Sequence, residues 1–206
     1  MHFRSLRWLA GLALAAGFVA PAAAHGPTRQ KVTETVAINA PADKVWAIVK
    51  DFGALQNWHP AIAESPADKG NEEGSVRQLK LKGGGALTET LEAYDAAKMR
   101  YSYRAKDGGA LPVTNYTSTI TVKAEGGSSV VEWRGAFYRG YPNNDPPPDQ
   151  NDEAAVAAIT GVYKAGLANL KAIAEKKYPP PRTTGSPLFR RDSVHSKTLP
   201  AISCIP

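Results

Sequence analysis

The stretch NDEAAVAAITGVYKAGLANLKAIAEKK, residues 151–177, decides the fold class. Its apolar side chains recur every three or four positions, which is the spacing of one helical face; they are Val156, Ile159, Tyr163, Leu167 and Leu170. Asn151 or Asp152 can cap the first turn, and the prolines at 179–181 end the helix. The sequence therefore predicts a long amphipathic helix that ends near Lys177.

The chain before this helix alternates apolar and polar residues in short runs, as strands do when one face of a sheet is buried. We expect strands near residues 31–39, 75–82, 87–94, 99–103, 116–122 and 131–137. Short turns between consecutive runs favour antiparallel pairing. Two short helices interrupt the series, one near 41–49 with Asn39 as its cap and one at 53–58.

The same alternation predicts which strand residues face the long helix. The expected inward residues are Val32, Glu34, Val36, Ile38, Leu87, Glu89, Leu91, Ala93, Met99, Tyr101, Tyr103, Tyr116, Ser118, Ile120, Val122, Val131, Trp133, Gly135 and Phe137. The long helix is the one expected element large enough to cover that face. We therefore predict an α+β domain, in which a curved antiparallel sheet wraps around the C-terminal helix and leaves a hollow between them.

The charge of the chain is concentrated at its two ends. The formal net charge is +6, yet between residues 25 and 177 the 19 lysines and arginines almost balance the 18 aspartates and glutamates. A nearly neutral domain argues against nucleic acid as a partner.

Residues 1–24 have the three parts of a secretory signal peptide. Arg4 and Arg7 supply the positive start, residues 9–19 are apolar, and three alanines precede His25. A membrane anchor is the alternative, but the apolar run is shorter than a bilayer requires. We expect cleavage near His25, a folded domain over residues 31–177, and no membrane span after cleavage.

The end of the chain, residues 178–206, is rich in proline and basic residues and shows no apolar period, so we expect a disordered tail. This tail holds Cys204, the single cysteine of the chain. No disulfide can therefore form within one molecule, although Cys204 can pair with another chain.

The sequence lacks the patterns that are typical of catalytic or cofactor sites. No cluster of histidines and cysteines has metal-ligand spacing, and no nucleophile elbow accompanies a Ser-His-Asp set. The glycines at 83–85 lack the residues that complete a phosphate or dinucleotide loop, and they indicate a turn between strands. We therefore predict no metal, no cofactor and no catalytic residue.

Several motifs taken together resemble one superfamily. They are APADKVW at 40–46, DF at 51–52, WHP at 58–60, TETL at 88–91, LPVTNY at 111–116 and VEW at 131–133. As a set they resemble the START-like, or SRPBCC, superfamily, which includes polyketide cyclase-like and Bet v 1-type proteins. The resemblance covers roughly residues 32–177 and implies a helix-grip fold with a ligand cavity.

One loop resembles a narrower branch of that superfamily. GAFYRG at 135–140 and PNNDPPP at 142–148 look like the MxaD-like periplasmic proteins of methanol-oxidation systems. That resemblance implies a periplasmic location and an accessory role towards methanol dehydrogenase and its cytochrome electron acceptor. Two alternatives stay open at superfamily level, a polyketide cyclase- or dehydratase-like enzyme and a carrier of a hydrophobic metabolite.

The resemblance also implies a cavity for a small, partly apolar ligand. In hormone-receptor relatives, the positions that match His59, Glu89, Tyr116 and Ser118 line the cavity. Aromatic walls with a few polar groups are typical of small-molecule pockets, so the inward faces add four candidates, Tyr101, Tyr103, Trp133 and Phe137.

Three polar residues have two interpretations each. An inward carboxylate is costly unless solvated or paired, so Glu89 either anchors a ligand or ordered water, or makes a structural hydrogen bond to a tyrosine hydroxyl. His59 is either a packing residue or a general base. Glu34 is either a second carboxylate in the cavity or exposed at the sheet edge.

Overall fold

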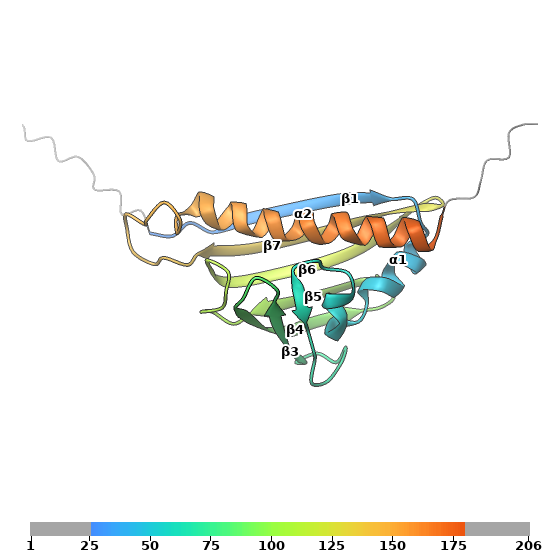
Figure 1. Cartoon of the computed structure of the whole chain (residues 1–206), viewed down its shortest axis with the longest axis horizontal. Helices are drawn as coiled ribbons and strands as arrows, with labels where there is room; N and C mark the ends of the chain where they lie inside the picture. The colour runs from blue at the N-terminus through green and yellow to red at the C-terminus, as the bar shows by residue number, and fades with distance from the viewer. Residues whose placement is uncertain (1–25, 180–206) are drawn as a thin grey trace, which may run out of the picture.

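The computed structural model describes residues 26–179, which form one seven-stranded sheet with helices on its inner side (Figure 1). The elements in chain order are β1 (Gln30–Ile38), α1 (Ala42–Val49), the 3-10 helix η1 (Phe52–Asn57), β2 (Ile62–Glu64), β3 (Val76–Leu81), β4 (Ala86–Asp95), β5 (Arg100–Ala105), β6 (Val113–Glu125), β7 (Ser128–Arg139) and α2 (Asp152–Lys177). The strands lie in the order β1-β7-β6-β5-β4-β3-β2, and all neighbours are antiparallel. The predicted α+β helix-grip fold is confirmed.

The long helix α2 lies lengthwise against the sheet (Figure 1). Asn151 is the cap, because its side chain accepts a hydrogen bond from the Ala154 N–H at 2.7 Å. The buried residues follow the predicted helical spacing and are Ala155, Ile159, Tyr163, Gly166, Leu167, Leu170 and Ala174. α2 packs mainly against β1 and β7. The inner faces of β3, β4 and β5 therefore pack mainly against side chains of elements other than α2. These three strands also form part of the wall of a cavity, which is described below.

The alternation of apolar and polar residues correctly predicted the inward faces of β6 and β7. It was less accurate at the end of β4 and at the start of β5. A register shift between Leu91 and Ala93 turns the strand, so Ala93 is exposed and Tyr94 packs against the core. The predicted inward position of Ala93 is therefore wrong. Met99 lies in the turn before β5, with a φ of 47°, so the strand begins one residue later than predicted. The Met99 side chain nevertheless packs against the core, as the alternation predicted.

The predicted cap of α1 differs from the structure. Pro41 occupies the N-cap of α1 without a side-chain hydrogen bond, and the Asn39 N–H instead donates to Glu175 Oε1 at 2.9 Å. Asn39 is therefore not the cap.

Glu34 lies on β1, the edge strand of the sheet, which agrees with the second of its two interpretations. Its side chain is 25% exposed and lies 3.9 Å from the ammonium group of Lys164 on α2, so it forms an ion pair between sheet and helix.

The domain continues one residue beyond the predicted boundary. The Tyr178 N–H donates to the Ala174 oxygen at 2.8 Å, and the Tyr178 side chain packs against the core.

The predicted signal peptide at 1–24, the tail from residue 180 onward and Cys204 lie outside the described residues. Between residues 26 and 179, no helix has both the length and the apolar character needed to cross a membrane.

Candidate functional site

A small cavity lies on the inner face of the sheet, beside α2 and over β3, β4 and β5. Its volume is about 90 Å³. The lining residues come from the sheet, η1, α2 and the connecting loops and are Leu55, His59, Ala61, Ile62, Leu79, Leu81, Leu87, Glu89, Tyr103, Leu111, Tyr116, Trp133 and Val162. Most of this wall is apolar, and Glu89 is its one carboxylate.

The mouth of the cavity is apolar and its floor carries the polar groups. Ala61 is exposed, and Leu81, Leu111 and Val162 are half-buried, whereas the other lining residues are buried. Leu81 and Leu111 each adjoin a turn, and the two turns contact one another because the Ala110 N–H donates to the Ala86 oxygen at 3.1 Å. A ligand would therefore enter past leucines before it meets a polar group.

The partner of Glu89 is Arg77, and not the tyrosine hydroxyl considered from the sequence. The two residues are directly paired across β3 and β4, and Arg77 Nε donates to Glu89 Oε2 at 2.7 Å. Their side chains are 0% and 3% exposed. Removing one member of a buried ion pair leaves an uncompensated charge, so each residue depends on the other.

The Arg77 guanidinium is held between two aromatic rings. Its central carbon lies 4.1 Å from the ring centroid of Phe52 and 4.7 Å from that of Tyr103, and Nη1 donates to the Phe52 oxygen at 2.9 Å. Burial acts against the charge and is the largest single influence. The attraction of Glu89, its hydrogen bond to Arg77 and the contributions of Tyr101 and Tyr103 together outweigh burial and raise the pKa of Arg77. Arg77 therefore stays cationic. Arg77 was not among the predicted site residues, although alternation between Ser75 and Leu79 places it inward.

A chain of hydroxyl groups joins the sheet to α2 behind the cavity. Trp133 Nε1 donates to Ser118 Oγ at 2.9 Å, and Ser118 donates to the backbone oxygen of Arg134 at 3.0 Å. The Tyr163 hydroxyl lies 2.8 Å from both Ser118 Oγ and the Tyr116 hydroxyl. Because the single hydrogen of Ser118 goes to the carbonyl, Tyr163 donates to Ser118 and Tyr116 donates to Tyr163.

These tyrosines stay neutral. Burial raises the pKa of Tyr103, Tyr116 and Tyr163 well above the ordinary value of 10.0. Their hydroxyls therefore keep their hydrogens at physiological pH. Gly135 is required at this place, because a Cβ there would overlap the Tyr163 hydroxyl.

His59 is held by two hydrogen bonds to backbone groups. Its Nε2 lies 3.0 Å from the Val162 oxygen, which can only accept, so this nitrogen carries the hydrogen. Its Nδ1 accepts from the Ala61 N–H at 3.3 Å. A general base needs a free nitrogen within reach of its substrate. The geometry therefore favours the packing interpretation of His59.

The buried imidazole should make stability depend on pH. Burial lowers the pKa of His59, the hydrogen bond to Val162 partly opposes this shift, and the charges of Arg77 and Lys82 add to it. The unfolded chain binds a proton near the ordinary pKa of 6.5, which the folded chain resists. The free energy of unfolding should therefore fall as the pH drops below about 6.5, by at most ~1.4 kcal/mol per pH unit. Thermal melts between about pH 7.5 and about pH 5 measure the slope.

The control is His59→Phe, which keeps a ring of similar size and removes the titrating group. His59 is the single histidine between residues 26 and 179, so this variant should flatten the slope above about pH 5. Equal slopes in both proteins would contradict the assignment.

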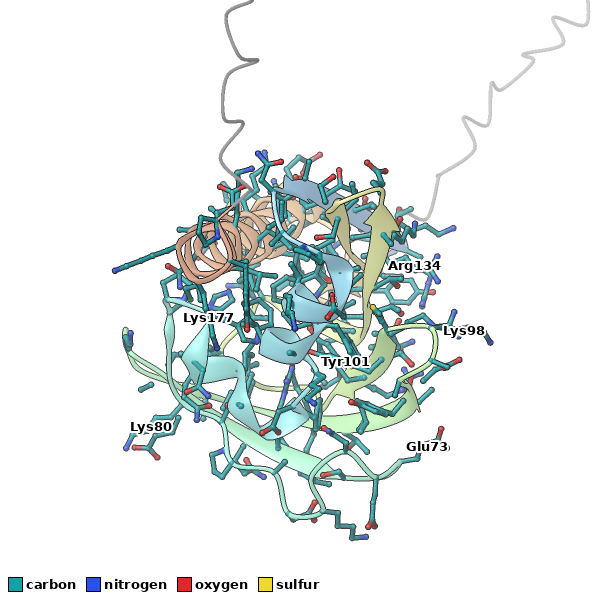
Figure 2. The ribbon with its side chains drawn as sticks, turned by 90° about the vertical axis from the view of Figure 1, so that its right-hand side faces the viewer. Glu73, Lys80, Lys98, Tyr101, Arg134 and Lys177 are labelled. Atoms are coloured by element: carbon teal, nitrogen blue, oxygen red, sulfur yellow. The ribbon has the colours of Figure 1, made fainter. Side chains whose placement is uncertain are left out.

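Five of the eight predicted site residues line the cavity: His59, Glu89, Tyr103, Tyr116 and Trp133. The other three are buried beside it. Ser118 belongs to the hydroxyl chain, and the Phe137 ring packs against Tyr116 at 6.1 Å between centroids. Tyr101 lies in the interior against Phe52, with 6.0 Å between ring centroids (Figure 2). The alternation of apolar and polar residues predicted that these side chains face inward, but it did not predict how far each lies from the cavity.

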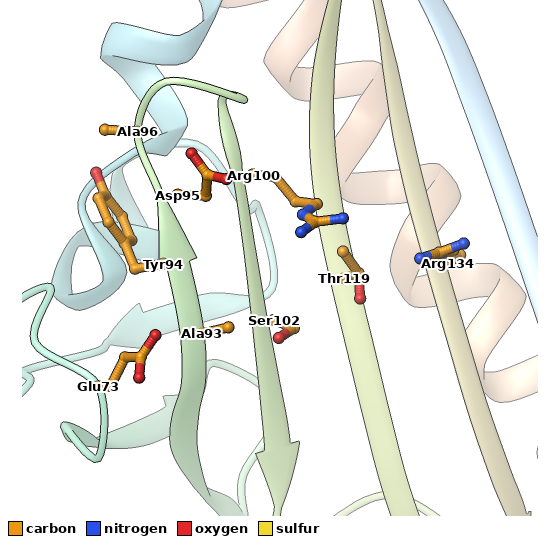
Figure 3. A pocket seen from close by; sticks show the side chains of 9 residues that line it. All are labelled: Glu73, Ala93, Tyr94, Asp95, Ala96, Arg100, Ser102, Thr119 and Arg134. Carbon is orange, nitrogen blue, oxygen red and sulfur yellow. The ribbon is translucent and has the colours of Figure 1, made fainter.

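Larger hollows lie on the outer face of the sheet. The one in Figure 3, of about 550 Å³, is lined by Glu73, Ala93, Tyr94, Asp95, Ala96, Arg100, Ser102, Thr119 and Arg134. Figure 2 shows Arg134 on the side of the sheet away from α2. This hollow is open and polar, whereas small-molecule sites are concave and mostly apolar. The inner cavity is therefore the better candidate.

The inner cavity offers hydrogen bonding rather than proton transfer. Its polar groups are the Glu89 carboxylate and the hydroxyls of Tyr103 and Tyr116, with neutral His59 and Trp133 beside them. Within residues 26–179, no group of three or more His, Cys, Asp or Glu side chains is placed to hold a metal ion. The arrangement can hold the polar end of a small molecule while leucines contact the rest.

A curved antiparallel sheet closed by one long helix over an inner cavity defines the helix-grip class. A family model described as polyketide cyclase / dehydrase and lipid transport matches residues 29–175. The chain therefore belongs to this family, within the SRPBCC superfamily that its motifs indicate.

Three similar proteins show the range of the fold. The structure of XoxI from Bacillus cereus is 31% identical, with a TM-score of 0.60 over 70% of this chain and 94% of that one. MLP-like protein 423 from Arabidopsis thaliana is 30% identical over 122 residues, 54% of this chain and 78% of the relative. Norcoclaurine synthase from Thalictrum flavum, solved with dopamine and hydroxybenzaldehyde, is 16% identical, with a TM-score of 0.57 over 73% and 88% of the chains. That identity supports a shared fold alone.

Proposed function

We propose that this chain is an exported, non-catalytic protein that binds a small, partly apolar ligand and assists methanol oxidation. The observation that carries the binding function is the apolar cavity with one carboxylate, which is already paired with Arg77. Acid–base catalysis needs two titrating groups with separated pKa values near one substrate. His59 has both nitrogens engaged and Arg77 stays protonated, so Glu89 lacks such a counterpart.

The two alternatives are a cyclase- or dehydratase-like enzyme and a carrier of a hydrophobic metabolite, and the family description covers both. The cavity of about 90 Å³ is well below the roughly 300–1,000 Å³ of typical ligand pockets. This volume argues against a large metabolite. An enzyme would need a second proton-transfer group that the cavity wall does not provide.

The accessory role rests on the loop between β7 and α2, whose sequence resembles MxaD-like proteins. The buried Arg139 side chain donates to the Tyr141 oxygen at 3.0 Å and to the Asn143 oxygen at 2.9 Å. Its guanidinium also lies 3.4 Å from the Asp152 carboxylate at the start of α2. The loop tip at 142–145 is exposed. An ordered, exposed loop loses little conformational entropy on binding, which suits a contact surface.

The proposed location is the periplasm. It rests on the signal-peptide pattern at residues 1–24, with cleavage before His25. The intact mass of protein isolated from the periplasm should correspond to a chain that starts near His25. Retention of Met1 in that protein would contradict export by this signal.

Adding the protein to methanol dehydrogenase and its cytochrome should change the rate of electron transfer between them. The loop variant carries Asn143→Ala, Asn144→Ala and Asp145→Asn. Asparagine is chosen at the last position because Asp145 has a φ of 54°, which asparagine tolerates better than alanine. We expect this variant to bind about tenfold more weakly, equivalent to ~1.4 kcal/mol. Stopped-flow kinetics and calorimetry measure the two effects.

The matched control is Lys80→Gln, an exposed change on β3 that leaves the loop unaltered. It should behave like the natural protein, and all three proteins should melt at similar temperatures. An electron-transfer rate that is the same with and without the natural protein would defeat the accessory role and leave ligand binding standing.

A further inference from the structure

We infer that the ligand of the inner cavity is a small, uncharged molecule that carries a hydroxyl group on an apolar body, with the hydroxyl directed at Glu89 and Tyr103. This inference rests on the proposed function, because it names the class of ligand for the same cavity. It follows from three properties of the floor: its charge, its unused hydrogen-bonding groups and its size.

The charge of the floor excludes ionic ligands. Arg77 and Glu89 form a buried pair whose charges cancel, with 2.7 Å between Nε and Oε2. An added cation would leave the buried region with a net positive charge, and an added anion would face the Glu89 carboxylate directly. Nη2 of Arg77 has no hydrogen-bond partner in the part of the chain that the structure describes, but Arg77 does not line the cavity, so it does not offer itself to an anion there. Either charge would therefore lose its hydration without gaining a free partner on the cavity wall.

The Glu89 carboxylate can accept more hydrogen bonds than it receives from the protein. Among the described residues, its one hydrogen-bond donor is Arg77 Nε, which bonds Oε2. A carboxylate can accept about four hydrogen bonds, so Oε1 remains available on the cavity side. Tyr116 also lines the cavity, but it donates its hydroxyl hydrogen to Tyr163 and can only accept from a ligand.

Tyr103 supplies the complementary donor. Its oxygen accepts from Trp133 Nε1 at 3.2 Å. Its own hydrogen cannot go to Ser118, because Ser118 Oγ already accepts from Trp133 and Tyr163. Glu89 pairs with Ala105 and Leu91 pairs with Tyr103, so Glu89 and Tyr103 are diagonal neighbours on one face.

A hydroxyl group satisfies both of these neighbours at once. It donates its hydrogen to Glu89 Oε1 and accepts from the Tyr103 hydroxyl. A carbonyl group can serve only Tyr103 and would leave its oxygen beside the carboxylate. An ether or a halogen lacks the donor that Glu89 requires. The hydroxyl is therefore the neutral group that pairs with both Glu89 Oε1 and the Tyr103 hydroxyl.

The size and the mouth of the cavity define the apolar part. The volume is about 90 Å³, and Leu81, Leu87 and Leu111 contact whatever lies nearer the mouth. An engineered apolar cavity that accepts benzene has a volume of about 150 Å³, so this cavity is too small for a six-membered aromatic ring. The fitting molecules are therefore short-chain alcohols.

The test is a titration of the whole protein with 1-propanol and with 1-fluoropropane, followed by NMR shifts of backbone amides at Leu87, Leu111 and Tyr116. The two probes have nearly the same shape, but only 1-propanol carries a hydroxyl. We expect 1-propanol to bind at least about tenfold more tightly than 1-fluoropropane, equivalent to ~1.4 kcal/mol. Propionate and propylamine, which are charged at neutral pH, should bind more weakly than 1-propanol.

A second variant separates recognition from folding. Tyr103→Phe keeps the ring against Arg77 and leaves the Trp133–Ser118 hydrogen bond in place. It should weaken 1-propanol binding several-fold and leave 1-fluoropropane binding unchanged. Equal binding of 1-propanol and 1-fluoropropane, tighter binding of a charged probe, or an unchanged 1-propanol affinity in Tyr103→Phe would overturn the hydroxyl inference while ligand binding stands. Failure of all four probes to bind would overturn ligand binding as well.

Discussion

Replacing Glu89 by glutamine should lower the free energy of unfolding by about 3–5 kcal/mol, because it leaves the Arg77 charge buried without a counter-charge. Arg77 is 0% exposed and its Nε–Oε2 distance to Glu89 is 2.7 Å. Water cannot replace the lost charge without disrupting the contacts with Phe52 and Tyr103. Urea denaturation of the natural protein and the variant measures the difference.

A double-mutant cycle with Arg77→Met tests the cause. Methionine is apolar and flexible, so it can fill the space between the two rings. The double variant should be more stable than Glu89→Gln alone, which is the non-additivity that coupled residues show. If the two single effects simply add, the ion pair contributes nothing, and the loss in Glu89→Gln has another origin.

Arg77 and Glu89 show which features of the interior could be predicted from the sequence and which could not. The alternation Leu87-Thr88-Glu89 placed the carboxylate inside correctly. The same rule places Arg77 inside, yet a long cationic side chain on an alternating strand usually extends to solvent. What buries it is a set of contacts from η1, β4 and β5, namely Phe52, Glu89 and Tyr103. No local pattern brings those three segments together.

The same limit applies to the candidate site as a whole. Helical and strand periods predicted the sheet, the long helix and the inward faces, because each depends on residues close in sequence. Whether a space in the interior is filled or left as a cavity depends on side chains from both the sheet and the helices. Tyr163 of α2 reaches Ser118 and Tyr116, so the space over β6 is occupied and Ser118 does not line the cavity. Gly135 permits that approach, which a strand pattern alone does not reveal.

Two glycines of α2 should respond in opposite directions when each is replaced by alanine. A Cβ on Gly166 would lie 2.6 Å from His59 Cδ2 and 2.7 Å from Trp133 Cζ3, and neither buried ring can move freely. His59 is held by its two backbone hydrogen bonds, and Trp133 stacks on Tyr163 with 4.5 Å between ring centroids. Overpacking of this kind costs about 1–3 kcal/mol, more than the ~1 kcal/mol that alanine gains over glycine in a helix.

We therefore expect Gly166→Ala to lower the melting temperature by about 2–4 °C, the shift of a net loss near 1 kcal/mol in a domain of this size. Gly161 is the matched control, because it is exposed on the same helix and a Cβ there would meet no atom within 4 Å. Gly161→Ala should raise the melting temperature by about 2–4 °C, since helix propensity then acts alone. Scanning calorimetry measures both changes. Because the Gly166 contact joins α2 to His59 and Trp133 of the cavity wall, Gly166→Ala should also weaken 1-propanol binding, which Gly161→Ala should not affect. A rise in melting temperature for both variants would show that α2 lies farther from His59 and Trp133 than the structure has it.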